Sequence, residues 1–259
     1  MNSKKVLVIM PAYNAGKTLE KTYREIPLDC VHACIVVDDV SADATVEIAR
    51  ELGLRVFLHQ ENQGYGGNQK TCYVEALKTG AEIIVMLHPD YQYDPKKIPE
   101  LVTPIAEGRA DVVLGSRMAY AVAGGMPLYK RIANRFLTWC ENRVFGLKLS
   151  EYHTGFRAFS RTALETFPFL LNSNDFIFDQ EIIAQAVWFN ARIDEISVPH
   201  RYFAEASTIN LGRSIHYGLG VLRLLAVFIL NRIGLLKSRI FRPLHHAYNE
   251  ISVREPSTP

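Results

Sequence analysis

Hydrophobic and polar positions along the chain alternate between short apolar runs and amphipathic segments. Val6 to Met10 is an apolar, β-branched run that ends at Pro11, and Gly16 to Glu25 then has helical spacing that Pro27 ends. Because strands that alternate with helices of this length form βαβ units, the pattern predicts an α/β fold with a mostly parallel sheet flanked by helices. Further strands are predicted at about 33–37, 54–58, 83–87, 111–114 and 193–198, and further helices at about 43–52, 68–78, 95–107, 129–145 and 179–190.

The pattern changes near the C-terminus. Val221 to Leu230 is strongly apolar, but it falls short of the roughly 20 residues needed to span a bilayer. One interpretation is an amphipathic helix lying in a membrane interface, and the other is a helix packed on the sheet. Basic residues on both sides favour the first, so 211–248 is predicted to be a helical appendage and 249–259 a disordered tail. The basic residues are Arg213, Arg223, Arg232, Lys237, Arg239 and Arg242.

Composition narrows the class of protein. The chain has 259 residues, 48% hydrophobic and 22% charged, which is ordinary for a globular protein with one large core. Its net charge of +2 without a dominant basic run does not indicate a nucleic-acid partner. The four cysteines form no complete zinc motif, and no export signal precedes the first strand, so we expect reduced thiols and the cytosol.

The apolar run 83–87 leads directly into polar residues that are able to bind a metal ion. His88, Asp90 and Gln92 alternate, so an extended chain would project all three to one side. Their oxygens suit Mg²⁺ or Mn²⁺, and the imidazole shifts the choice towards Mn²⁺. The alternative is a polar turn before a helix that opens at Asp94-Pro95.

Polar groups also follow two other predicted strands. Tyr13 and Asn14 follow the first, and Asp38-Asp39 end the second. Since the carboxyl ends of parallel strands meet at one edge of a sheet, these groups predict a ligand site there, with a carboxylate facing a ribose or base. The alternative for Asp38 and Asp39 is helix capping ahead of Ser41. Two glycine-containing segments, 64–67 and 119–125, are predicted to be flexible loops.

The segment from Pro11 to Thr18 resembles a phosphate-binding loop. It matches G-x-x-x-x-G-K-[ST] except at its first position, which is proline. Proline lacks an N–H and restricts the backbone, which disfavours a phosphate nest. A nucleotide hydrolase therefore stays the second hypothesis.

Several segments together resemble the family 2 glycosyltransferases of GT-A fold, with the closest likeness to the dolichol- or polyprenol-phosphate mannose synthase branch. The likeness runs from about Val6 to Tyr202. It rests on Pro11-Ala-Tyr-Asn14, Val37-Asp-Asp39 with Ser41 and Asp43, Asn62-Gln-Gly64 with Gly67, His88-Pro-Asp90, Asp111-Val-Val-Leu-Gly-Ser-Arg117 and Thr154-Gly-Phe-Arg157.

The resemblance implies inverting transfer of a sugar from a GDP- or UDP-linked donor to a polyprenyl or dolichyl phosphate, on the cytoplasmic face of a membrane contacted through 213–242. It implies a nucleotide-sugar half at about 1–115 and an acceptor half at 116–210. Its catalytic residues would be Asp90, Arg117 and Arg131, with Mn²⁺ or Mg²⁺ held by His88, Asp90 and Gln92. The nucleotide-sugar would contact Pro11, Tyr13, Asn14, Asp38, Asp39, Gly67, Asp90 and Arg201, and the acceptor phosphate would contact Arg117, Arg131 and Arg135.

The chain departs from the family pattern at two places. The family's metal motif Asp-x-Asp-x-Gln begins here with His88, and the segment Arg201 to Ser207 is one residue longer and lacks the family's glycine and lysine. These departures motivate a third hypothesis, a nucleotide-binding module without catalysis. If the acceptor were a sugar hydroxyl, a carboxylate base would be needed, and Asp179 or Glu181 would be the candidate.

Overall fold

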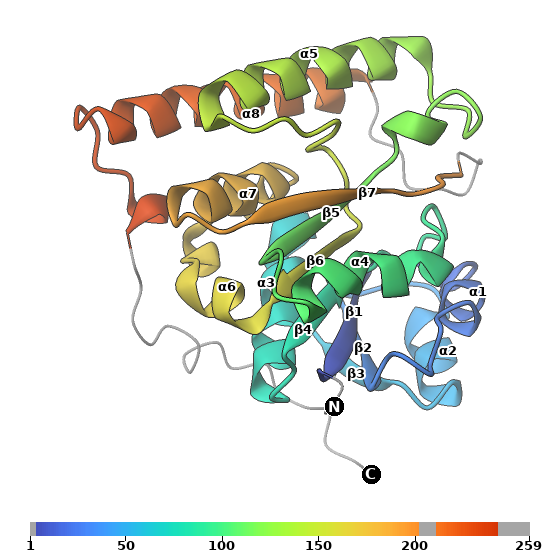
Figure 1. Ribbon diagram of the computed structural model, residues 1–259. Coiled ribbons are helices and arrows are strands. Elements are labelled where there is room, and N and C mark those ends of the chain that lie inside the picture. Colours follow the sequence, from blue (N-terminus) through green and yellow to red (C-terminus); the bar gives the residue numbers. More distant parts are fainter. Residues whose placement is uncertain (1–3, 202–210, 243–259) are drawn as a thin grey trace.

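A seven-stranded sheet in the order β3-β2-β1-β4-β6-β5-β7 forms the centre of the protein (Figure 1). The computed structural model describes residues 4–201 and 211–242. All strand pairs are parallel except those of β6, which runs antiparallel to β4 and β5, so the predicted α/β fold with a mostly parallel sheet is confirmed. The strands are β1 (Val6–Ala12), β2 (Ala33–Asp38), β3 (Arg55–Leu58), β4 (Ile83–Met86), β5 (Val112–Ser116), β6 (Arg157–Ser160) and β7 (Ile193–Ser197).

Helices cover both faces of the sheet, which explains why the central strands are apolar without alternation. Every residue of β1 and β4 is buried, as expected for parallel strands packed on two sides. One face packs against α1, α2 and α4, and the other against α3, α6, α7 and α8. The helices are α1 (Leu19–Arg24), α2 (Thr45–Glu51), α3 (Gly64–Lys78), α4 (Ile98–Ala106), α5 (Leu128–Phe145), α6 (Arg161–Thr166), α7 (Phe178–Trp188) and α8 (Leu211–Arg232), with short 3₁₀ turns η1 (Pro95–Lys97), η2 (Met118–Tyr120), η3 (Phe169–Leu171) and η4 (Arg239–Phe241).

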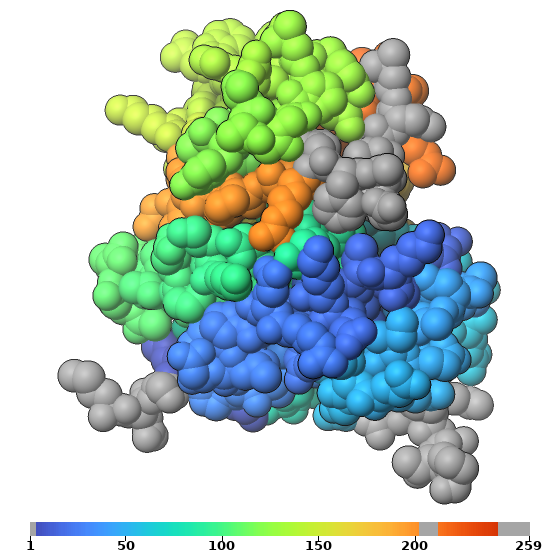
Figure 2. Space-filling view, turned by 90° about the vertical axis from the view of Figure 1, so that its right-hand side faces the viewer, coloured from blue at the N-terminus to red at the C-terminus, as the bar shows by residue number. Residues whose placement is uncertain are grey.

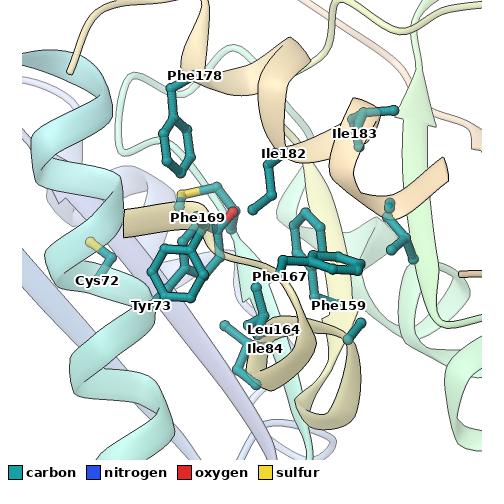
Figure 3. Close-up of a cluster of buried hydrophobic side chains, with 14 of the residues drawn as sticks. Cys72, Tyr73, Ile84, Phe159, Leu164, Phe167, Phe169, Phe178, Ile182 and Ile183 are labelled. Carbon is teal, nitrogen blue, oxygen red and sulfur yellow. The ribbon is translucent and has the colours of Figure 1, made fainter. Parts of the chain in front are cut away.

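An aromatic cluster joins the two halves of the chain on the second face of the sheet (Figure 3). Tyr73 of α3 makes edge contacts with Phe159 and Phe169, at ring-centroid distances of 5.5 and 5.6 Å. Phe178 of α7 stacks on the same ring at 6.3 Å. Burial of such large side chains stabilises the packing of α3 and α7, the two helices whose N-terminal ends border the cleft described below.

The structure differs from the sequence-based expectations in the glycine segment 64–67. This segment is the first turn of α3 and not a flexible loop. A Cβ at Gly66 would lie 2.4 Å from the carbonyl oxygen of Ser173, and Gly64 has a φ of +78°. The glycines therefore serve close packing of α3 on the 173–174 backbone. Strand β6 and helix α6 were not predicted, because 151–160 is polar in sequence.

Helix α8 (Leu211–Arg232) extends well beyond the apolar run from Val221 to Leu230. By length and composition Gly212–Arg232 is apolar enough to cross a membrane, so the expectation that the run is too short is wrong. One side of the helix nevertheless packs into the core, with Val221, Leu224 and Phe228 buried. Residues 243–259, which include the predicted tail 249–259, lie outside the described residues.

Candidate active site

A cleft of about 1830 Å³ lies at the carboxyl ends of the parallel strands and extends towards α5, α7 and α8. Polar groups that follow β1, β2, β4 and β5 line one part of it, where open α/β sheets bind ligands. Apolar side chains of α5 and α8 line the far end, among them Leu137, Leu224 and Val227. Eight of the predicted site residues line this cleft: Pro11, Tyr13, Asn14, Asp39, His88, Asp90, Gln92 and Arg117.

Asp39 is the centre of the predicted nucleotide end. Its Oδ1 lies 2.7 Å from His59 Nδ1 and accepts the backbone N–H of Gln63 over 2.7 Å, and its Oδ2 accepts the N–H of Gly64 over 3.0 Å. These bonds hold the carboxylate at the start of α3, where its charge is favourable. Tyr13 is 59% exposed at the same end of the cleft and presents a ring face able to stack on a base.

Asp38 and Gly67 do not line the cleft. Asp38 is buried and accepts hydrogen bonds from the backbone N–H and the hydroxyl of Ser41, in the turn before α2. It caps no helix, because the N-cap of α2 is Ala44. Gly67 packs on Gln63 and Asn174 inside α3's first turn. Both residues therefore lie behind the cleft lining and support the predicted nucleotide end through the segments that they contact.

The loop from Asn14 to Thr18 is not arranged as a phosphate nest. Its backbone N–H groups already donate to side chains of the loop after β2: Asn14 to Ser41 Oγ, Ala15 to Thr45 Oγ1 and Gly16 to Asp43 Oδ2, over 2.8, 2.8 and 2.9 Å. A nest binds phosphate through such N–H groups. The nucleotide-hydrolase hypothesis therefore lacks its binding element.

The residues His88, Asp90 and Gln92 do not project to one side. Strand β4 ends at Met86, and Tyr91 has a φ of +59°, so the chain turns instead of staying extended. His88 Nε2 lies 3.2 Å from the hydroxyl of Tyr65, while Gln92 Oε1 lies 2.9 Å from His200 Nε2. The expected alternation is wrong, because the backbone conformation breaks it.

Burial makes His88 and Asp90 unusual titrating groups. Burial lowers the pKa of His88 to about 4, so its imidazole is neutral at physiological pH. Burial raises the pKa of Asp90 to about 6. Within residues 4–201 and 211–242, no three His, Cys, Asp or Glu side chains are grouped to hold a metal ion. The half-buried carboxylate of Asp90 does fit a cation that takes its other ligands from a diphosphate and water, as Mg²⁺ commonly does.

Arg117 is fixed at the end of β5 by Glu151, a carboxylate with no exposed surface. The guanidinium Nε donates to Glu151 Oε1 over 2.9 Å, and its Nη2 donates to the same oxygen and to the carbonyl oxygen of His153. Asn134 of α5 also donates to Glu151 Oε1 over 2.8 Å. Arg117 therefore presents its positive charge to the cleft from a rigid support.

Helix α5 presents a different basic residue to the cleft than the resemblance implied. Lys130 lines the cleft, together with Asn134 and Leu137 on the same face of the helix. Burial and the positive charge of Arg117 lower the pKa of Lys130. Arg131 and Arg135 are not among the lining residues, and Arg135 is exposed on the outer side of α5. The sequence carries no signal for Lys130, because the apolar stripe of α5 that contains Leu128, Ile132 and Phe136 is exposed and the buried side is partly polar.

Asp179 is held in a buried polar network that the sequence did not indicate. It accepts hydrogen bonds from the Tyr65 hydroxyl over 2.8 Å and from Gln69 Nε2 over 2.9 Å, and Arg157 Nη2 lies 3.1 Å from its Oδ2. Both oxygens of Asp179 are thus engaged by neighbouring side chains. Glu181 lines the cleft and accepts the backbone N–H of Ser173 over 2.6 Å.

Tight packing surrounds His88. A Cβ at Gly155 would lie 2.6 Å from His88 Cδ2, so residue 155 has no room for a side chain. The ring of Tyr65 stacks on His88 with centroids 5.4 Å apart. Arg201 lies outside the cleft lining, over the Tyr91 ring at 4.4 Å and 3.9 Å from Glu25. The rest of the altered segment, 202–207, lies outside the described residues.

Comparison with known families identifies the chain. Residues 7–167 match the model of glycosyl transferase family 2. The chain belongs to this family. A relative from Methanocaldococcus jannaschii, described as an uncharacterized protein, is 30% identical to this glycosyltransferase over 203 residues, covering 78% of its chain and 84% of the relative. The UDP-N-acetylglucosamine--dolichyl-phosphate N-acetylglucosaminyltransferase of Methanococcus voltae is 26% identical over 246 residues, which is 86% of this glycosyltransferase and 98% of the relative.

Solved structures support the assignment of the fold. Glucosyl-3-phosphoglycerate synthase from Mycobacterium tuberculosis, in complex with Mn²⁺, UDP-glucose and phosphoglyceric acid, matches this glycosyltransferase with a TM-score of 0.67. The two chains are 20% identical, and the match covers 91% of this chain and 81% of the synthase. The GT-A fold expected from the resemblance is therefore confirmed.

Proposed function

We propose that this glycosyltransferase moves a sugar from a nucleotide-sugar to a polyprenyl or dolichyl phosphate, with inversion at the anomeric carbon, on the cytoplasmic face of a membrane. The observation that carries the proposal is the composition of the cleft. Its lining includes Tyr13 and Asp39, the basic residues Arg117 and Lys130, and apolar side chains of α5 and α8. A nucleotide, a phosphate and an isoprenoid chain would each find matching surroundings there.

A phosphate acceptor needs no general base. A phosphate monoester is anionic at neutral pH, so its oxygen attacks the anomeric carbon without losing a proton first. The carbon–oxygen bond to the nucleoside diphosphate breaks, and its electron pair leaves with the diphosphate. Arg117 and Lys130 would orient the attacking phosphate. Asp179 is paired with Arg157, which disfavours the hydroxyl-acceptor alternative.

Asp90 would hold a divalent cation on the diphosphate, as the aspartate motif of the family does. When bound, Mn²⁺ or Mg²⁺ would stabilise the charge that develops on the departing diphosphate. Asp90 is suited to this role because its half-buried carboxylate lacks a close ion-pair partner among the described residues and a cation would supply one. His88 would support the turn through Tyr65, and Gln92 would fix His200.

The name of one relative favours a lipid-linked acceptor, and the name of another favours a role in glycan biosynthesis. The Methanococcus voltae enzyme is named for a dolichyl-phosphate acceptor, and it spans nearly the same length as this chain. The hexosyltransferase Agl6 of Haloferax volcanii, named for glycan biosynthesis, is 33% identical over 159 residues, although these are only 37% of its length. We therefore rank transfer to a polyprenyl phosphate above transfer to a soluble acceptor.

The proposal is tested by incubating the purified chain and Mn²⁺ with a panel of labelled GDP- and UDP-sugars and detergent-dispersed dolichyl phosphate. We expect one donor to give a labelled lipid, and the same donor to raise the melting temperature of the protein with Mn²⁺. If a donor binds but no donor gives a product, the proposed enzymatic activity is refuted and the hypothesis of a nucleotide-binding module without catalysis is favoured. ATP or GTP turnover without a sugar donor would favour the hydrolase.

A further inference from the structure

We propose that α5 and α8 together form a docking surface for an anionic lipid bilayer, with α5 as the helix that enters the lipid. This surface extends the proposed membrane contact of 213–242 to a second helix, and the choice of a lipid partner rests on the proposed function. The two helices lie side by side at the end of the molecule furthest from β3 (Figure 1). They run parallel, because Phe145 packs on Phe228 at 5.0 Å while a Cβ at Gly218 would meet Leu137 at 3.8 Å.

The outer side of α5 carries an apolar stripe that no residue of 4–201 or 211–242 buries. Leu128, Ile132, Phe136 and Trp139 recur at the spacing of one helix face. Ile132 and Trp139 are each 61% exposed. The buried residues of the same helix, such as Leu137 and Glu141, lie on the opposite side. In Figure 2 the yellow-green atoms of α5 form the top of the molecule.

Helix α8 repeats this arrangement. Its inner side packs on the core through residues such as Leu224 and Phe228, whereas Ile215, Leu219 and Ile229 are exposed. Among the described residues, thirteen of the eighteen exposed large hydrophobic side chains belong to α5, α8 or the turn that follows α8. Such a concentration marks an interaction site, since single exposed apolar residues are ordinary but contiguous ones are not.

The positive charge of α5, α8 and the residues that follow each helix indicates an anionic partner. Residues 128–148 and 211–242 contain eleven Lys and Arg and one acidic residue, Glu141, which is buried. The rest of the chain contains 18 Lys and Arg and 26 Asp and Glu. A basic, apolar surface is attracted to anionic lipid head groups, with Trp139 and Tyr129 suited to the interface. Two copies of this surface would repel each other, which disfavours a dimer.

The packing of α8 favours a helix that lies along the membrane over one that crosses it. Phe228 contacts the rings of Phe145, Trp188 and Phe241, with centroids 5.0 to 5.6 Å apart. Crossing a bilayer would remove these aromatic contacts and expose the core beneath them. Docking leaves them intact and places the apolar end of the cleft, lined by Leu137 and Val227, beside the lipid that supplies the acceptor.

The experiment is flotation of the full chain with phosphatidylcholine vesicles, with and without phosphatidylglycerol, in the absence of donor and acceptor. We expect binding that requires phosphatidylglycerol and weakens with salt. We expect Ile132→Ser with Trp139→Ser to weaken partitioning roughly tenfold or more, while the matched control Leu28→Ser, an exposed apolar residue outside α5 and α8, has no effect. Trp139 fluorescence shifts to the blue on vesicle addition, and Trp139→Phe removes the shift.

Three results would overturn the docking surface. These are failure of the wild-type chain to float with anionic vesicles, flotation that the double variant retains, or a lipid-free dimer that the double variant dissociates. Retention in the membrane after carbonate extraction would show that α8 crosses the bilayer instead. Circular dichroism confirms that the variants are folded. The assay needs no sugar transfer, so a chain that floats but gives no labelled lipid would refute the proposed function alone.

Discussion

Arg117 and Glu151 form an ion pair in which both the backbone and the side chain of the arginine take part. The N–H of Arg117 donates to Glu151 Oε2 over 2.6 Å, while its Nε donates to Oε1 over 2.9 Å. Because Glu151 is buried and also bonded to Asn134, the pair fixes the end of β5 to α5. The position of a proposed phosphate-binding arginine thus depends on a residue that does not line the cleft.

Glu151→Gln keeps the shape of this support and removes its charge. We expect the KM for dolichyl phosphate to rise roughly tenfold, because Arg117 loses its charged anchor, while the KM for the donor stays unchanged. Steady-state kinetics with each substrate varied in turn measures the split. Glu107→Gln, in an exposed pair with Arg109, is the control. An equal rise in both KM values would contradict the assigned role.

Asp90→Asn is expected to stabilise the metal-free protein and to abolish transfer. Burial raises the pKa of Asp90 from 3.8 to about 6, so the carboxyl destabilises the fold as the pH rises through this window and does so fully above about 6. Removing the charge should raise the free energy of unfolding at pH 7.5 by up to about 3 kcal/mol. Urea unfolding in EDTA at pH 4 and pH 7.5 measures the free energy of unfolding of both proteins. The stability gained by the variant should vanish at pH 4, where the carboxyl of Asp90 is protonated in the folded protein. The exposed Asp29→Asn serves as the control, and a less stable variant at pH 7.5 would refute the assignment.

Lys130 and Arg131 are neighbours that the structure places differently, and their variants should differ accordingly. Lys130→Met should reduce kcat/KM for dolichyl phosphate by roughly 10- to 100-fold, because it removes a positive charge from the cleft, and Lys130→Arg should restore part of the loss. Arg131→Met should have a much smaller effect in detergent-dispersed assays. Equal losses in the two methionine variants would show that the helix presents both residues to the acceptor.

His88→Gln tests whether the imidazole binds the metal. Glutamine retains an N–H donor for the oxygen of the Tyr65 hydroxyl, whose own proton goes to Asp179, so we expect the Mn²⁺ concentration that gives half-maximal activity to stay unchanged. Since burial lowers the pKa of His88 to about 4, activity should also show no titration of this residue between pH 6 and 8. A large rise in the required Mn²⁺ concentration would restore His88 as a ligand.

Most of the fold could be predicted from the sequence because its strands are continuous apolar runs between helical segments. The runs at β1, β2 and β4 carry this signal without help from distant residues. Strand β6 could not be predicted, because Arg157 interrupts its apolar pattern. That arginine is buried only because Asp179, 22 residues later, lies beside it, and such a pairing is not visible in local sequence.

The candidate site was predictable where it depends on strand ends and not where it depends on side-chain direction. Asp39, Asp90 and Arg117 follow their strands into the cleft, as the sheet requires. His88 and Gln92 diverge because Tyr91 takes a left-handed conformation, and Lys130 replaces Arg131 because α5 begins at Leu128 with a phase that the motif alone does not specify.

The contact between Gly155 and His88 constrains how this enzyme could be redesigned. Any residue with a side chain at position 155 would strike the imidazole, since its Cβ would lie 2.6 Å from Cδ2. Replacing His88 with a smaller residue would relieve that clash and open a void beside Tyr65. A mutational library that varies either position alone would therefore sample mostly damaged proteins, whereas one that varies the two together would include pairs of side chains that fit the same space.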